Sequence, residues 1–183
     1  KRRTIHAMME LKYSEILKLN KELENNLTSS SYSITVLSNI IVHQIKEILE
    51  YLLRCEDINA NVRLGDYGSV VQDSQKYKNS NAVIIFWELC NFIDGLQYKI
   101  ELINNDQLDE ILEKTKSEID LVLKNLEKTS LVLINKFTSL SFSSLNIRKN
   151  NLEELAGQLN QYLENSIPAN VRLVELEKVI ANI

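Results

Sequence analysis

The sequence predicts a three-layer α/β domain built on a mostly parallel five-strand sheet, and three observations lead to this fold class. Strand-like and helix-like segments alternate along most of the 183 residues. Glycine (4 residues) and proline (1 residue) are scarce, which favours long uninterrupted elements over a loop-rich all-β fold. Apolar residues make up 44% of the chain and charged residues 25%, so a core can form and disorder is not expected.

The chain opens on an amphipathic segment that we expect to be a helix. Apolar residues recur near helical spacing from Thr4 to Glu24. A run of threonine and serine interrupts the pattern at residues 28–31. We therefore expect a helical extension over residues 1–27 and the α/β domain over residues 28–183. One hypothesis for the extension is self-association through its apolar stripe.

Five segments have the composition of β-strands. They are Ser33–Ser38, Ala60–Leu64, Ala82–Trp87, Ser130–Asn135 and Asn170–Val174. The third and fourth are almost entirely apolar, as parallel strands are when helices cover both faces. The second and fifth alternate valine and leucine with asparagine and arginine, which is typical of strands at the edge of a sheet. The sequence therefore predicts the flavodoxin-like order 2-1-3-4-5.

Helical patterns separate these strands. The main predicted helices are Ile40–Arg54, Asp106–Lys128 and Leu152–Asn165. The first has an apolar stripe that begins at Ile41, and Ser38 or Asn39 is expected to be its N-cap. His43 is expected on the same helix, sharing a face with Glu47 and Glu50 away from that stripe.

Charge and composition exclude several partners. The net charge is −4, and lysine and arginine alternate with acidic residues, so no nucleic acid is expected to bind. The longest apolar runs, such as Ala82–Trp87, are far too short to span a membrane, so no membrane partner is expected. No phosphate-binding glycine motif and no cluster with metal-ligand spacing is present, so neither a cofactor nor a metal is expected.

The two cysteines indicate a reducing environment. Cys55 and Cys90 are far apart and follow no metal-ligand spacing. No histidine pattern accompanies either one, so a catalytic thiol is the less favoured alternative. We expect two reduced, partly buried thiols and a cytoplasmic protein.

Candidate ligand-binding residues follow from the topology, because ligands of open parallel sheets bind outside the carboxyl ends of the strands. The residues at these ends are Ser38, Asn39, Asp66, Tyr67, Gly68, Glu88, Asn91, Asn135, Lys136 and Glu175. They would form a polar rim suited to hydrogen bonding. Each also has an alternative role in a cap or a turn, such as the strand-to-helix turn expected at residues 65–68.

Four stretches of the chain resemble the amino-terminal domain of FkbH-like proteins. They are V-L-S-N-I-I-V (Val36–Val42), G-D-Y-G-S-V-V-Q-D-S (Gly65–Ser74), W-E-L-C-N-F-I-D-G-L (Trp87–Leu96) and N-V-R-L-V-E-L-E (Asn170–Glu177). The resemblance covers nearly the whole chain and implies a fold like that of SGNH (GDSL) hydrolases. It also implies a downstream domain of the haloacid dehalogenase (HAD) superfamily. The missing initiator methionine and the abrupt end at Ile183 suggest a fragment of such a protein.

The resemblance implies roles for individual residues. The SGNH nucleophile would fall at Ser38, or at Asn39 after a shift of one residue, and the oxyanion donors would be Gly68 and Asn91. The final D-x-x-H motif has no counterpart, because the last loop reads V-E-L-E-K. A serine without a positioned base loses several orders of magnitude in rate. The D-x-D-x-T motif of the HAD domain is also absent from this chain.

Two functional expectations follow from the resemblance. The first is a non-catalytic SGNH-like domain that positions a phosphorylated small-molecule substrate, an acyl carrier protein or the downstream HAD-like domain. The alternative is a working SGNH-type esterase or acyltransferase that uses Ser38 with a base supplied from elsewhere.

Overall fold

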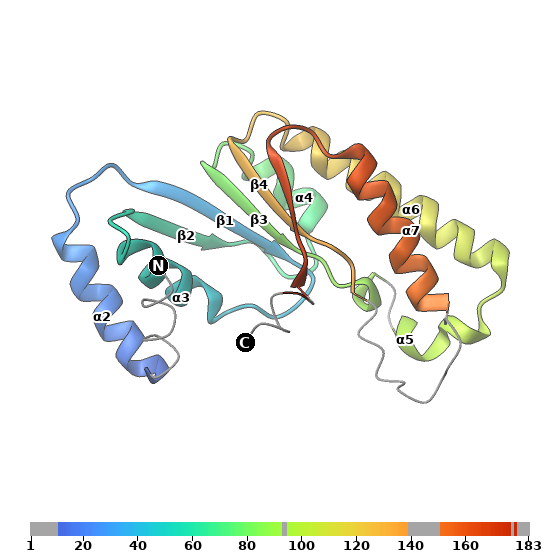
Figure 1. The fold of residues 1–183 in the computed structure, drawn as a ribbon, viewed down its shortest axis with the longest axis horizontal. Coiled ribbons are helices and arrows are strands. Elements are labelled where there is room, and N and C mark those ends of the chain that lie inside the picture. Colours follow the sequence, from blue (N-terminus) through green and yellow to red (C-terminus); the bar gives the residue numbers. More distant parts are fainter. Residues whose placement is uncertain (1–10, 93–94, 139–150, 177, 179–183) are drawn as a thin grey trace.

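The computed structural model describes residues 11–92, 95–138, 151–176 and 178. It contains the five strands β1 (Tyr32–Ser38), β2 (Ala60–Leu64), β3 (Ala82–Phe86), β4 (Leu131–Asn135) and β5 (Val171–Val174). Every neighbouring pair is parallel, and the order is β2-β1-β3-β4-β5 (Figure 1). The predicted fold class and strand order are therefore confirmed, with the two mixed segments at the edges of the sheet.

Helices cover both faces of the sheet and give three layers. They are α2 (Tyr13–Asn26), α3 (Ile45–Arg54), α4 (Val70–Lys76), α5 (Leu96–Lys99), α6 (Asn105–Asn125) and α7 (Asn151–Ser166), with 3₁₀ turns at Leu89–Asn91 and Ile100–Leu102. In Figure 1, α3 lies on one side of the sheet with α2 packed beside it, and α4, α6 and α7 lie on the other side. This placement follows from right-handed crossovers between parallel strands.

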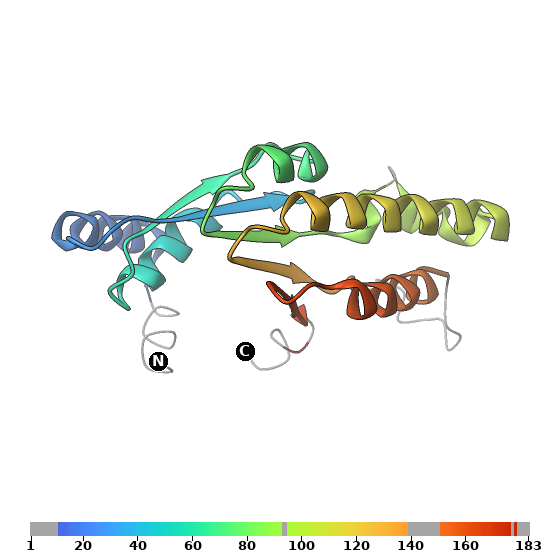
Figure 2. The same ribbon diagram turned by 90° about the horizontal axis from the view of Figure 1, so that it is seen from above.

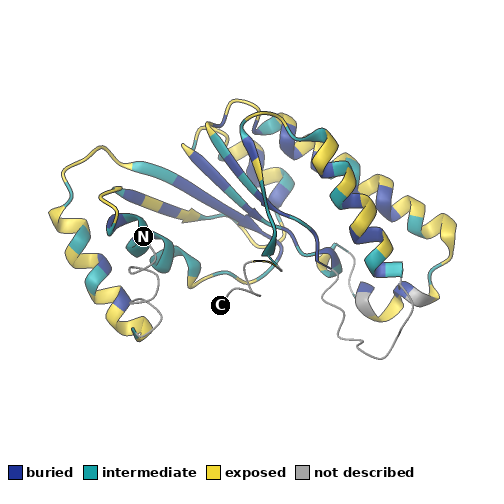
Figure 3. Cartoon of the chain, in the orientation of Figure 1, coloured by how far each residue is buried: buried dark blue, intermediate teal, exposed yellow. Residues whose placement is uncertain are grey.

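Two apolar clusters reflect these layers. The larger one joins alternate residues of the sheet, such as Val83 and Ile134, to buried leucines of α6 and α7. The smaller one packs the opposite faces of β1 and β2, including Val36 and Val62, against α3. Figure 3 shows the resulting alternation of buried and exposed residues along β2.

The start of α3 differs from the sequence prediction. The helix begins at Ile45 rather than Ile40, and its N-cap position is Gln44, so the expected cap at Ser38 or Asn39 is wrong. Ile41, expected in the apolar stripe, is 79% exposed. The run Ile40-Ile41-Val42 is β-branched, and such residues lose side-chain freedom in a helix. The loop also holds Ile40 in place, because its carbonyl accepts a hydrogen bond from the Ser38 hydroxyl at 2.7 Å.

A buried polar network joins α2, α3 and the outer edge of β2. The Glu50 carboxylate accepts hydrogen bonds from the Val62 backbone N–H (2.9 Å) and from the Asn20 side-chain amide (3.3 Å). The Arg54 guanidinium donates to the Ala60 carbonyl at 3.1 Å and to the Asn20 side-chain oxygen at 2.9 Å. These side chains therefore satisfy backbone groups of an edge strand that would otherwise be open to another strand.

This network corrects one prediction about α3. Glu50 was expected to share a face of the helix with His43, away from the apolar stripe, yet it is only 6% exposed, and His43 lies in the turn before the helix. A carboxylate can be buried here because a backbone N–H and an amide bind it. The same network ties α2 to the sheet, since Asn20 contributes to both halves of it.

Candidate functional site

All five strands are parallel, so their carboxyl ends lie at one edge of the sheet, here called the carboxyl edge. The predicted ligand-binding residues lie at this edge or in the segments that directly follow the strands. They are Ser38 at the end of β1 and Asn39 after it, Asp66, Tyr67 and Gly68 after β2, Glu88 and Asn91 after β3, Asn135 at the end of β4 and Lys136 after it, and Glu175 after β5. Their hydrogen bonds show how each side chain is used.

Two asparagines bind the backbone of the segment that follows β3. Asn39 accepts from the Glu88 N–H at 2.7 Å and donates to the Glu88 carbonyl at 2.8 Å. Asn135 accepts from the Trp87 N–H at 2.7 Å and donates to the Trp87 carbonyl at 2.9 Å. Each side-chain amide thus imitates a peptide group and continues the pairing of β1, β3 and β4 beyond the last strand residues.

A third asparagine repeats this arrangement one strand further on. Asn160 of α7 accepts from the Phe137 N–H and donates to the Phe137 carbonyl, both at 2.8 Å. We call these three paired contacts the asparagine clasps. Sequence reasoning did not single out Asn160, because it lies within an ordinary helical pattern and its partner is 23 residues away.

Ser38 is buried and its hydroxyl is engaged. The residue is 7% exposed, and Oγ donates to the Ile40 carbonyl at 2.7 Å. Among the described residues, no histidine or carboxylate forms a hydrogen bond with this hydroxyl. A nucleophilic serine needs a base within hydrogen-bond reach, and none is in place here.

The two candidate oxyanion donors converge on the segment that contains Ser38 and Asn39. The Gly68 N–H donates to the Ser38 carbonyl at 3.1 Å, and the Asn91 side-chain amide donates to the Asn39 carbonyl at 2.8 Å. Gly68 and Asn91 therefore both lie beside the segment that contains Ser38 and Asn39. Both donors are already satisfied by backbone oxygens, so in this arrangement neither is free for an oxyanion.

Residues 65–68 form the strand-to-helix turn that the sequence predicted. The Asp66 N–H donates to the buried carboxylate of Asp73 at 2.6 Å, and Gly68 has a left-handed backbone with φ 72°. A Cβ at Gly65 would lie 2.6 Å from Asp73 Oδ2 and 2.7 Å from a Leu37 methyl, so this position requires glycine. Tyr67 is 66% exposed at the tip of the turn.

Glu88 caps the short turn that follows β3. Its Oε1 accepts from the Cys90 N–H at 3.3 Å, and its Oε2 lies 3.5 Å from the Thr138 hydroxyl. This is the capping role that the sequence offered as the alternative for Glu88. The position also places a carboxylate beside the Cys90 thiol. Burial, reinforced by Glu88, raises the pKa of Cys90 to about 11.

We expect Cys90 to react slowly with alkylating reagents. A raised pKa lowers the thiolate fraction at pH 8, and the greater nucleophilicity of a basic thiolate offsets only part of this loss. In a Cys55→Ser variant, iodoacetamide should modify Cys90 roughly tenfold or more slowly at pH 8 than it does in urea. The folded-state rate should climb as the pH approaches the pKa. A plateau below pH 9 would contradict this assignment.

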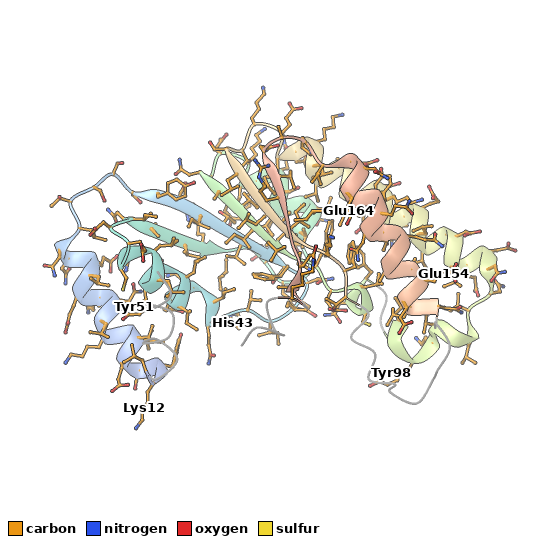
Figure 4. All side chains as sticks on the ribbon, viewed as in Figure 1. Lys12, His43, Tyr51, Tyr98, Glu154 and Glu164 are labelled. Carbon is orange, nitrogen blue, oxygen red and sulfur yellow. The ribbon has the colours of Figure 1, made fainter. Side chains whose placement is uncertain are left out.

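A hollow of about 450 Å³ lies beside the carboxyl ends of β4 and β5. Lys136 lies at its wall, with Nζ 2.6 Å from Glu164 Oε1 and 3.1 Å from Glu175 Oε1. The hydrogen bonds that Lys136 donates to Glu164 and Glu175 raise the pKa of Lys136. The pKa of Glu175 is lowered, mainly by its hydrogen bond with Lys178 and next by its hydrogen bond with Lys136. Figure 4 labels Glu164 on α7, where nothing in the sequence distinguished it from other surface glutamates.

Gly157 forms an open part of the wall of this hollow. It lies within α7, and a Cβ built on it would meet no atom within 4 Å. Glycine inside a helix costs about 0.5–1 kcal/mol relative to alanine. We therefore expect Gly157→Ala to raise the free energy of unfolding by that amount in urea titrations. A loss of stability would mean that another group occupies this space.

The described residues offer little further catalytic chemistry. His43 is exposed, and Figure 4 shows it on the segment before α3. His6 lies outside the described residues. No three histidine, cysteine, aspartate or glutamate side chains in the described ranges come together in a way that could hold a metal ion. Likewise, no helix in those ranges is long and apolar enough to cross a bilayer.

These observations define an α/β protein with an all-parallel 2-1-3-4-5 sheet and a carboxyl edge closed by its own hydrogen bonds. No family model and no curated protein matches the sequence. The fold is similar to that of the N-terminal part of the protein BF1531 from Bacteroides fragilis, a crystal structure containing a phosphatase domain complexed with Mg. The TM-score is 0.70 and the identity 13%, over 93% of this chain. This chain spans about half (46%) of that structure.

Proposed function

We propose that this chain is the N-terminal, SGNH-like and non-catalytic domain of an FkbH-like protein of the HAD superfamily. Its role would be to position a phosphorylated small-molecule substrate, an acyl carrier protein or the downstream HAD-like domain. The fold shared with the N-terminal part of a phosphatase-domain protein supports this proposal. The sequence stretches that resemble the FkbH-like amino-terminal domain support it independently.

One observation carries the non-catalytic part of the proposal. At the position of the SGNH nucleophile, the Ser38 hydroxyl is bonded to Ile40 and the Asn39 amide is bonded to Glu88. An amide cannot replace a serine as nucleophile, and a hydroxyl without a base is a weak one. At Ser38 and Asn39, the carboxyl edge therefore offers hydrogen-bonded polar side chains rather than an activated nucleophile.

Ester hydrolysis distinguishes this role from the alternative of an SGNH-type esterase. With short p-nitrophenyl esters, we expect no turnover above the buffer rate from either the unmodified protein or Ser38→Ala. A bona fide SGNH esterase assayed in parallel confirms that the substrates are competent. Turnover that is present in the unmodified protein and lost in Ser38→Ala would establish the esterase instead.

The family assignment has its own test in the gene. We expect a D-x-D-x-T motif in the open reading frame shortly beyond Ile183, because that motif supplies the HAD nucleophile in the resembled family. Co-purification of the separately expressed downstream segment with this chain would then support domain positioning. A reading frame without the motif would remove the FkbH-like assignment and leave the fold unaffected.

A further inference from the structure

A second hollow lies on the sheet itself, near the amino ends of the strands and away from the carboxyl edge. Its volume is about 340 Å³, and its lining includes Ser33, Asn61, Arg63, Lys76, Asn79 and Ser80. In the register of β1 and β2, Ser33 pairs with Asn61 and Thr35 with Arg63, so polar side chains of both strands share one face.

The hollow exists because α4 is short. Parallel sheets normally carry helices over both faces, and their strands are then apolar on both sides. Here α4 has only seven residues, Val70–Lys76. Figure 2 shows it beside the arrowhead end of β1. The residues that follow α4 line the hollow, and Ser80 forms a 2.8 Å hydrogen bond with the buried Thr35 hydroxyl.

The lining of this hollow is positively charged, although the protein as a whole is acidic. It includes Arg63 and Lys76 but no aspartate or glutamate, although the chain has a net charge of −4. By contrast, the hollow at β4 and β5 includes Glu153 and Glu175, and one between α6 and α7 includes Asp109.

Both cations retain hydrogen-bonding capacity. Arg63 is exposed, and within the described ranges its guanidinium has no carboxylate within 4 Å and no hydrogen bond. Lys76 Nζ lies 4.8 Å from the centre of the Tyr77 ring and 3.9 Å from oxygens of Asp66 and Asp73, beyond hydrogen-bond length. The Tyr77 side chain raises the pKa of Lys76, and the carboxylates of Asp73 and Asp66 raise it further, so the ammonium stays charged.

We propose that this hollow binds the phosphate group of a small phosphate monoester. A guanidinium binds phosphate oxygens through two parallel N–H donors, and an ammonium adds a second positive charge for the dianion. The surrounding side-chain amides of Asn61 and Asn79 suit a hydroxylated body, whereas the Ser33 hydroxyl already donates to Asn81 Oδ1 at 2.8 Å. The volume matches a small molecule and is too small for a folded partner. The proposal is independent of the role proposed for the carboxyl edge.

The sequence supplies a matched control for its test. The pentapeptide A-N-V-R-L occurs in both edge strands, at Ala60–Leu64 and Ala169–Leu173. In the second copy, the Arg172 guanidinium donates to the Ala169 and Val171 carbonyls at 2.7 and 2.8 Å. Arg172→Gln therefore removes the same charge from the other edge of the sheet, where the guanidinium is already bound to neighbouring backbone carbonyls.

The experiment is a titration of the ¹⁵N-labelled protein with inorganic phosphate and with glycerol phosphate, followed by amide chemical shifts. We expect shifts at residues 33–35, 61–63 and 79–80, with tighter binding of the ester. Arg63→Gln should weaken binding about tenfold or more, Lys76→Gln should weaken it less, and Arg172→Gln should leave it unchanged within about twofold.

Several outcomes would overturn the proposal. Equal losses of binding affinity in Arg63→Gln and Arg172→Gln would show that the protein attracts the anion only through its general positive charges. Shifts confined to the carboxyl edge would place the anion elsewhere. Equal affinity for phosphate and ester would exclude a site for the ester body. Unchanged shifts outside the hollow establish that the variants are folded.

Discussion

Arg54→Ala is expected to lower the free energy of unfolding by about 3–5 kcal/mol, a large part of the stability of a domain this size. The guanidinium is 4% exposed and donates to the Ala60 carbonyl, to Asn20 and to Glu24. Its removal leaves buried oxygens without donors, and each costs free energy. Urea unfolding followed by circular dichroism measures the change in midpoint and slope.

The matched control is Arg172→Ala on β5. That side chain also donates to backbone carbonyls, but it is exposed, so water can replace it. We expect a loss within about 1 kcal/mol. Equal losses in the two variants would mean that burial of the Arg54 network contributes nothing specific. A lower slope for Arg54→Ala alone would indicate that α2 has already detached from the folded protein.

Asn135→Ala should have the second largest effect, a loss of about 2–4 kcal/mol. The asparagine is 4% exposed and satisfies both the N–H and the carbonyl of Trp87, which is itself 3% exposed. Alanine leaves both backbone groups buried without partners. Trp87 is the only tryptophan in the chain, so its fluorescence reports unfolding and any opening of this asparagine clasp directly.

Two further variants help to separate the contributions of the individual hydrogen bonds at this edge. Asn135→Asp keeps an acceptor for the Trp87 N–H and loses the donor to its carbonyl, so an intermediate loss is expected. Asn91→Ala removes one hydrogen bond at the same edge, to the Asn39 carbonyl, and should cost about 1 kcal/mol. If Asn135→Ala costs no more than Asn91→Ala, the clasp is not a major source of stability.

The strand order could be predicted because the composition of the second to fifth strands indicated which are central and which lie at the edges, and the flavodoxin-like order fits that assignment. The Ala82–Phe86 and Leu131–Asn135 strands are apolar on both faces, which only the interior of a parallel sheet explains. Helix ends were less predictable. The first turn of the predicted Ile40–Arg54 helix is a loop, and the seven-residue α4 was not placed, because a short segment carries too little periodicity.

The sequence predicted where the candidate site lies, but not how its side chains are hydrogen-bonded. The sequence placed Ser38, Asn39, Asn91 and Asn135 at one edge, and the structure brings them together there. Their partners could not be predicted, since Asn39 binds a residue 49 positions away and Asn135 one 48 positions away. Such contacts depend on the register of neighbouring strands, which a single sequence does not encode in any local pattern.

By itself, the sequence determined the architecture of this protein, because hydrophobic periodicity and strand composition are local properties of the chain. Only the tertiary structure decided which polar residues are available to a ligand. Glu50 and Arg54 resemble surface residues in the sequence, yet they are buried to satisfy an edge strand. Arg63 resembles any edge-strand arginine, yet it lines a cationic hollow. Burial and hydrogen-bond satisfaction are properties of the packed chain.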